Sequence, residues 1–109
     1  MKKPINNVFL TYASDILADT NTGLTSTEIG KYFSAKSLDY NVDIPFHKPP
    51  FVDVPNKRTA FLENLKRFNS DQQFEIIQET IERLQHLDSV KDLKNKLYSQ
   101  YPEYIPSGR

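Results

Sequence analysis

Apolar residues recur at spacings of three and four over most of the chain, which places them on one face of a helix. Capping residues, glycine and proline separate these periodic segments. We therefore expect five short helices over about residues 5–18, 26–35, 56–68, 71–87 and 90–99. A long proline-rich loop, residues 39–55, separates the second helix from the third, and residues 100–109 are expected to form an irregular tail. The pattern predicts one all-α domain of residues 1–109, a small bundle with an ordered loop.

Three helix ends carry local signals. Thr25 and Glu28 have the spacing of a capping box, in which a hydroxyl and a carboxylate satisfy the first free amides of a helix. Ser70 and Gln73 repeat this spacing before the fourth helix. Gly23 is suited to a left-handed cap after the first helix.

Each predicted helix has an apolar face that we expect to be buried. Because the helices are short, packing of these faces rather than intrinsic propensity must hold them. The expected core residues are Ile5, Val8, Phe9, Tyr12, Ile16 and Leu17, then Ile29, Tyr32 and Phe33, then Phe61, Leu62, Leu65 and Phe68, then Phe74, Ile77, Ile81 and Leu84, and finally Val90, Leu93 and Leu97.

The loop 39–55 holds four of the seven prolines, with apolar side chains between them. Proline confines any strand here to a sheet edge and favours an extended, polyproline-like backbone. A flexible linker would not carry so many apolar side chains, so we expect the loop to pack across the helices. Loops of this length are usually functional or else disordered. The candidate partner-binding residues are Phe46, Pro49, Pro50 and Phe51.

Positive and negative charges balance, with 14 Lys and Arg against 14 Asp and Glu. A dedicated nucleic-acid binder usually has a large basic excess. The densest basic group is Lys57, Arg58, Lys66 and Arg67, and the helix 71–87 that follows it is strongly acidic. We expect these two segments to pair. Nucleic-acid binding through the four basic residues is the alternative hypothesis.

A helix-turn-helix interpretation of Thr25–Phe33 and Lys57–Phe68 is disfavoured. That motif joins its helices by a turn of ~3–4 residues. The loop 39–55 is far longer.

No residue pattern indicates catalysis. The chain has no cysteine, and neither His47 nor His86 has a third ligand at metal-binding spacing. No Gly-x-Ser-x-Gly nucleophile motif occurs, and three glycines cannot form a phosphate-binding loop. We expect a protein that is not an enzyme and that needs no metal or cofactor. A deep pocket around His47 and Asp43 would revive the hypothesis of a hydrolytic enzyme.

The chain has no apolar run near the ~18 residues of a membrane span. Asn6, Asn7 and Asp15 interrupt the start of the chain, which argues against a signal peptide. We therefore expect a cytoplasmic protein without membrane contact.

Two segments carry a resemblance to a known family. Leu24–Phe33 begins with a small, polar, Glu-Ile-Gly helix start, and Asn56–Leu65 is a Lys-Arg helix with leucine near its end. Together with the loop between them they resemble the N-terminal helical domains of AbiJ-like abortive-infection proteins, over roughly residues 24–85. The resemblance implies an accessory domain at the front of bacterial anti-phage effectors, one that senses or relays the infection signal.

The effector part of that family often carries an arginine–histidine motif, for which Arg83 and His86 are too close together. The resemblance therefore extends to the accessory domain only. Because the chain ends soon after its last predicted helix, we expect an isolated domain or a fragment of a larger effector.

The leading hypothesis is a non-catalytic interaction or sensor domain of a bacterial defence or regulatory protein. It would recognise a protein partner or effector domain, or self-associate, through loop 39–55 and helix 56–68. The alternative is a nucleic-acid-binding helical domain that uses helix 56–68.

Overall fold

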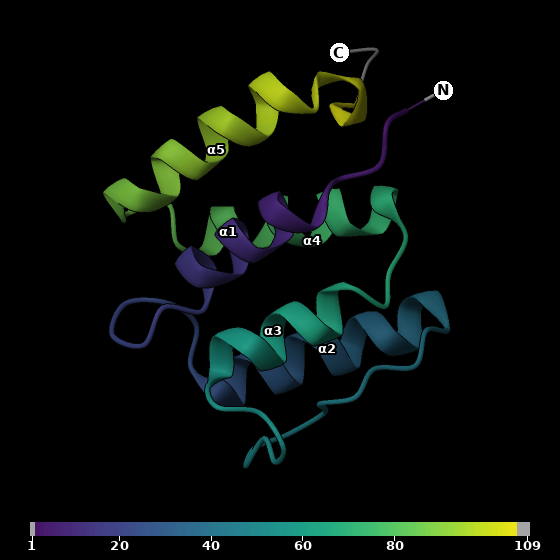
Figure 1. The fold of residues 1–109 in the computed structure, drawn as a ribbon, viewed down its shortest axis with the longest axis vertical. Helices are drawn as coiled ribbons and strands as arrows, with labels where there is room; N and C mark the ends of the chain where they lie inside the picture. Colours follow the sequence, from purple (N-terminus) through teal and green to yellow (C-terminus); the bar gives the residue numbers. More distant parts are fainter. Residues whose placement is uncertain (1, 107–109) are drawn as a thin grey trace.

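The described part of the chain, residues 2–106, folds into five α-helices arranged in three tiers and one short 3-10 helix. The computed structural model describes residues 2–106. The helices are α1 (Asn7–Leu17), α2 (Ser26–Tyr40), α3 (Lys57–Leu65), α4 (Ser70–Arg83) and α5 (Asp88–Gln100), followed by the 3-10 helix η1 (Pro102–Tyr104). Helices α2 and α3 lie side by side at one end of the long axis, α1 and α4 form the middle, and α5 covers the other end (Figure 1). The predicted all-α bundle is confirmed.

Helix α3 packs against both α1 and α2, so its apolar face lies at the centre of the lower tiers. The ring of Phe61 meets that of Phe33 edge to face, with centroids 5.0 Å apart. On α5 the predicted face of Val90, Leu93 and Leu97 is fully buried. Every buried side-chain nitrogen and oxygen within residues 2–106 has a hydrogen-bond partner.

The buried face of α1 differs from the predicted one. Val8, expected in the core, is 80% exposed, whereas Leu10, Ala13 and Ser14 are buried. Helix α1 touches α3, α4 and α5, so its buried side is wide and includes small residues at close approaches. The expected face included Val8 in place of Leu10, and it left out the small residues Ala13 and Ser14.

The helix starts follow the capping principle, with one shift of register. Thr25 Oγ1 accepts from Glu28 N at 3.1 Å, and Glu28 Oε1 accepts from Thr25 N at 2.8 Å, so this capping box is confirmed. The box of α4 uses Asn69 and Gln72, one residue before the predicted pair. The prediction was wrong because asparagine caps a helix as well as serine does.

Several helix ends also differ from prediction. Helix α2 continues to Tyr40 rather than ending near residue 35, and Asn41 closes it in a left-handed conformation with φ 54°. Helix α4 ends at Arg83 rather than near residue 87, and α5 already begins at Asp88. Gly23 does not adopt the expected left-handed conformation. Its lack of a side chain is needed instead because a Cβ there would lie 2.3 Å from Asp19 N.

The tail was expected to be irregular, but Pro102–Tyr104 forms a 3-10 turn. Residues 107–109 of that prediction lie outside the described residues. Tyr101 and Tyr104 are buried, and each binds the N-terminal segment: Tyr101 Oη accepts from Asn6 N at 3.2 Å, and Tyr104 Oη donates to Lys3 O. The two ends of the described chain thus lie side by side (Figure 1).

Lys36 joins α2 to α4. Its side chain is only 12% exposed, and Nζ lies 2.7 Å from Glu75 Oε2 and 2.9 Å from Glu79 Oε1. The rings of Tyr32 and Tyr40 flank the ammonium, with centroids 5.6 and 5.5 Å away. Burial alone would lower the pKa of Lys36, but the hydrogen bonds to both carboxylates outweigh it and raise that pKa. A charge withdrawn from water in this way is stable only while it stays paired.

This cluster makes stability depend on pH. Hydrogen bonds from Lys36 and then Tyr40 lower the pKa of Glu75 below the ordinary 4.5. A carboxyl group with a lowered folded pKa stabilises fully above its unfolded pKa, and this contribution is lost as pH falls through the folded pKa. We expect urea denaturation to show a free energy of unfolding that decreases below about pH 4.5, and less steeply in Glu75→Gln. Glu82→Gln, an exposed change on the same helix, should retain the wild-type slope, and identical slopes in all three proteins would contradict the expectation.

Candidate binding surface

Residues 41–56, which we call the strap, connect α2 to α3 at the end of the molecule opposite α5 (Figure 1). Ile44 is buried, and Val42 and Phe51 pack half-buried against the core. The expected packing of the loop across the helices is therefore confirmed. Its first residues, 39 and 40, belong to α2.

Asn64 of α3 fixes the strap by a paired contact. Its side chain is fully buried, with Oδ1 accepting from Phe46 N at 3.0 Å and Nδ2 donating to Phe46 O at 2.8 Å. The amide thus meets both polar backbone groups of one residue, as a neighbouring strand would. A buried amide is costly when it is unpaired, so this contact sets the register of the strap on α3.

Helix α2 holds the next residues of the strap. A Cβ on Gly30 would lie 2.5 Å from His47 O, so the strap crosses α2 at a distance that only glycine permits. Ser34 Oγ donates to His47 O at 3.2 Å and lies 3.1 Å from His47 Nδ1. The backbone around residues 46–48 is therefore tied to two helices.

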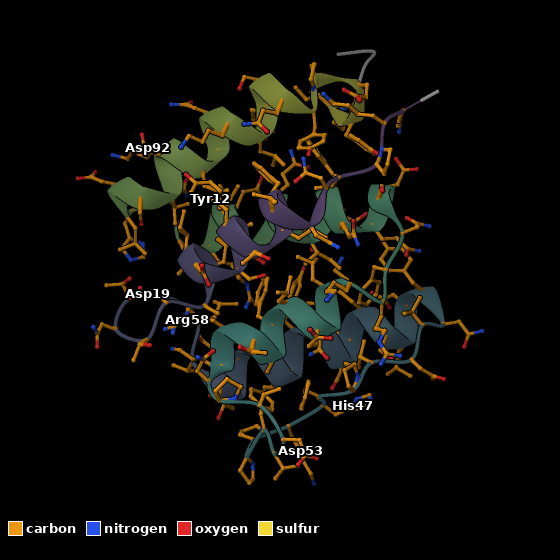
Figure 2. All side chains as sticks on the ribbon, in the orientation of Figure 1. Tyr12, Asp19, His47, Asp53, Arg58 and Asp92 are labelled. Atoms are coloured by element: carbon orange, nitrogen blue, oxygen red, sulfur yellow. The ribbon has the colours of Figure 1, made fainter. Side chains whose placement is uncertain are left out.

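The outer side of the strap carries apolar side chains around an open cavity of about 430 Å³. Val52 is 64% exposed at its rim, and the ring of Phe46 meets that of Phe51 edge to face at 5.7 Å. Figure 2 shows His47 and Asp53 on this outer segment. The cavity is lined by Pro45, Phe46, His47, Lys48, Pro50, Val52 and Asp53.

The four predicted partner-binding residues therefore occupy different positions. Phe46 and Pro50 line the cavity. Phe51 supports Phe46 from the core side, and Pro49 is half-buried outside the lining. Val52 was missed because one valine among many apolar loop residues gives no signal of its exposure.

The basic residues at the start of α3 bind other parts of the same chain. Lys57 Nζ donates to Leu24 O at 2.7 Å, and Arg58 donates to Thr20 Oγ1 at 2.7 Å with its Nε 3.8 Å from Asp15 Oδ1. Figure 2 shows Arg58 beside the α1–α2 connection. These two side chains hold that connection against α3.

The other two cations lie at the opposite end of α3. Lys66 Nζ is 3.4 Å from Glu63 Oε2 of its own helix, and Arg67 is exposed. Nine helical residues span about 13 Å, so the four cations form two separate groups. The expected pairing with the acidic helix was wrong, because Glu75 and Glu79 of α4 form salt bridges with Lys36 of α2.

The surroundings of His47 differ from the deep pocket with Asp43 that a hydrolytic enzyme would need. His47 contacts Ser34, and the cavity beside it is lined by Asp53 rather than by Asp43. Within residues 2–106, no group of three or more His, Asp or Glu side chains could hold a metal ion. In the same part of the chain, no helix has both the length and the apolar character needed to cross a membrane.

Comparison with known proteins gives no relative: no family model, no curated protein and no solved structure matches this chain.

The contact of Asn64 with the strap can be tested by Asn64→Leu, which keeps much of the side-chain volume but leaves Phe46 N and O without partners. We expect the free energy of unfolding in urea to fall by about 2–4 kcal/mol, and the Phe46 amide to exchange hydrogen faster. Asn95→Leu, an exposed asparagine on α5, should change stability by less than about 0.5 kcal/mol. Unchanged exchange at Phe46 in Asn64→Leu would show that the strap is held by other contacts.

Proposed function

We propose that this protein is a non-catalytic interaction domain that recognises a protein partner with the outer side of the strap. The observation that carries the proposal is the combination of a fixed backbone with exposed apolar side chains. Asn64 and Ser34 hold the strap on two helices and Gly30 leaves room for its close approach, while Val52 remains 64% exposed above an open cavity.

A fixed strap favours binding for an energetic reason. Ordering a flexible loop on association costs free energy, and a loop that is already ordered avoids most of that cost. Interfaces commonly depend on a few apolar or aromatic anchors in a pocket, surrounded by polar groups. Here Phe46, Pro50 and Val52 supply the apolar wall, and Lys48 and Asp53 supply charges beside it.

The proposed partner is a protein segment that inserts an apolar side chain into this cavity. Pro45 and Pro50 cannot donate backbone hydrogen bonds, so recognition there depends on side-chain packing. The resemblance of Leu24–Phe33 and Asn56–Leu65 to AbiJ-like accessory domains supports a role in a bacterial defence or regulatory protein. The partner would then be an effector domain, or a second copy of this chain.

Nucleic-acid binding by the basic group of α3 has less support. Lys57 and Arg58 already hold the α1–α2 connection, which leaves Lys66 and Arg67 as the accessible pair. Releasing the first pair for phosphate contacts would cost the internal bonds that they make.

The proposal can be tested with linear peptides selected by phage display on the wild-type protein. Val52→Asp places a charge on the apolar wall at an exposed position, so it should weaken the selected peptides about tenfold without loss of stability. Leu38→Asp makes the same change at a residue of α2 that is 84% exposed and outside the cavity, and should leave affinity unchanged. Peptides that lose equal affinity in both variants, or in neither, would overturn the proposal.

A second test moves the strap without changing its side chains. Gly30→Ala adds a methyl group that would lie 2.5 Å from His47 O, although alanine suits the helix better than glycine. We expect unchanged helix content by circular dichroism but weaker peptide binding.

Phe51→Ala, which removes the ring that packs against Phe46, should weaken binding of the same peptides more than Lys66→Ala does.

A further inference from the structure

A second cavity, which we call the aromatic hollow, lies between the start of α1 and the end of α5. It has a volume of about 300 Å³, and α5, which forms one of its walls, lies at the opposite end of the long axis from the strap (Figure 1). Figure 2 shows Tyr12 on the side of α1 that faces α5. The hollow is lined by Asn6, Val8, Phe9, Tyr12, Lys96 and Gln100.

Two rings and one exposed valine form its apolar part. The buried ring of Phe9 lies 5.9 Å from that of Tyr12 and 5.3 Å from that of Tyr101, measured between centroids. Val8 stands 80% exposed beside them. Aromatic faces next to an aliphatic side chain suit a flat, unsaturated ring better than a chain of irregular shape.

The polar lining complements such a ring. Asn6 Oδ1 accepts from Phe9 N at 2.8 Å and so caps α1, which leaves the amide nitrogen of Asn6 as its donor toward a ligand. Gln100 supplies a second amide, with both a donor and an acceptor. Amides of this kind recognise the edges of nucleobases.

Lys96 is the one charged residue in the lining. Its Nζ lies 4.8 Å from the centroid of Tyr12, and the salt bridges found within residues 2–106 do not include it. An exposed cation–π contact is weaker than a charge-assisted hydrogen bond, so an anion would draw this ammonium from the ring. Lys3, over the ring of Tyr101 at 5.2 Å, stands next to the same aromatic group.

Carboxylates stand outside this cavity. Asp15 lines a neighbouring depression further along α1, together with Tyr12, and Glu103 Oε2 accepts from Lys3 N at 3.3 Å. An anion in the hollow would therefore meet Lys96 first.

We propose that the aromatic hollow binds a nucleobase with its attached phosphate. The base would stack on the half-buried ring of Tyr12, Asn6 and Gln100 would bind its edge, and Lys96 would bind the phosphate. The same chemistry is offered by a free mononucleotide and by a single strand of RNA or DNA. A duplex hides the faces of its bases, so it would offer only phosphates. This site is separate from the strap and does not depend on the proposed protein partner.

The test is a titration of the isotope-labelled wild-type protein at low salt, followed by amide and side-chain NMR. The probes are the four common mononucleotides, an eight-residue single-stranded oligonucleotide of mixed sequence and a DNA hairpin duplex. We expect shifts at Asn6, Val8, Tyr12 and Gln100 with mononucleotides or with the single strand, and whichever binds identifies the source of the base. No shift with any probe, or equal affinity for the duplex, would overturn the proposal.

Variants separate this site from non-specific charge. Lys96→Gln should weaken binding about tenfold, and Val8→Asp, exposed and therefore harmless to the fold, should do the same by placing a carboxylate at the wall. Lys66→Gln and Lys91→Gln remove a lysine outside the hollow and should leave the affinity unchanged. Equal losses in all four variants would mean binding by charge alone and would contradict a built site.

Discussion

The arrangement of this molecule depends on one buried amide. Asn64 sits in the core at full burial, and its two polar atoms are satisfied by the backbone of Phe46 alone. Slipping the strap by one residue would break both bonds and leave an unpaired amide in an apolar interior. The strap therefore has one register on α3. That register places Phe46 toward the outside and Ile44 toward the core.

Several charged side chains connect one element of the fold to another. The formal charge is zero, and cations from several elements reach into neighbouring parts of the fold rather than gathering on one face. Each of the six tyrosines also has a cation over its ring. The methylene groups of these lysines cover apolar ring surface, while their ammonium groups remain able to bind water or other partners. A net charge of zero therefore gives no indication of the local charged contacts that form when the chain folds.

Local signals could be predicted from the sequence and distant pairings could not. The capping box at Thr25 and the buried face of α5 depend on neighbouring residues, so spacing alone reveals them. The exposure of Val8 and the burial of Asn64 depend on which helices pack there. Nothing in the sequence around Asn64 distinguishes it from an exposed polar residue of a basic helix. The order of the strap could be predicted because it contains many apolar residues between its prolines. The aromatic hollow was not found, because its residues come from the two ends of the sequence.

The contacts between the chain ends have a kinetic consequence. Lys3 and Tyr104 are 101 positions apart, and Asn6 and Tyr101 are 95 apart, so these bonds close almost the whole chain into a loop. Closing such a loop costs conformational entropy, and contacts this far apart in sequence slow folding. Contacts near chain ends are also the first to open in local fluctuations. Since the hollow is lined by residues 6–12 and by Lys96 and Gln100, it exists only when the two ends of the described chain have met.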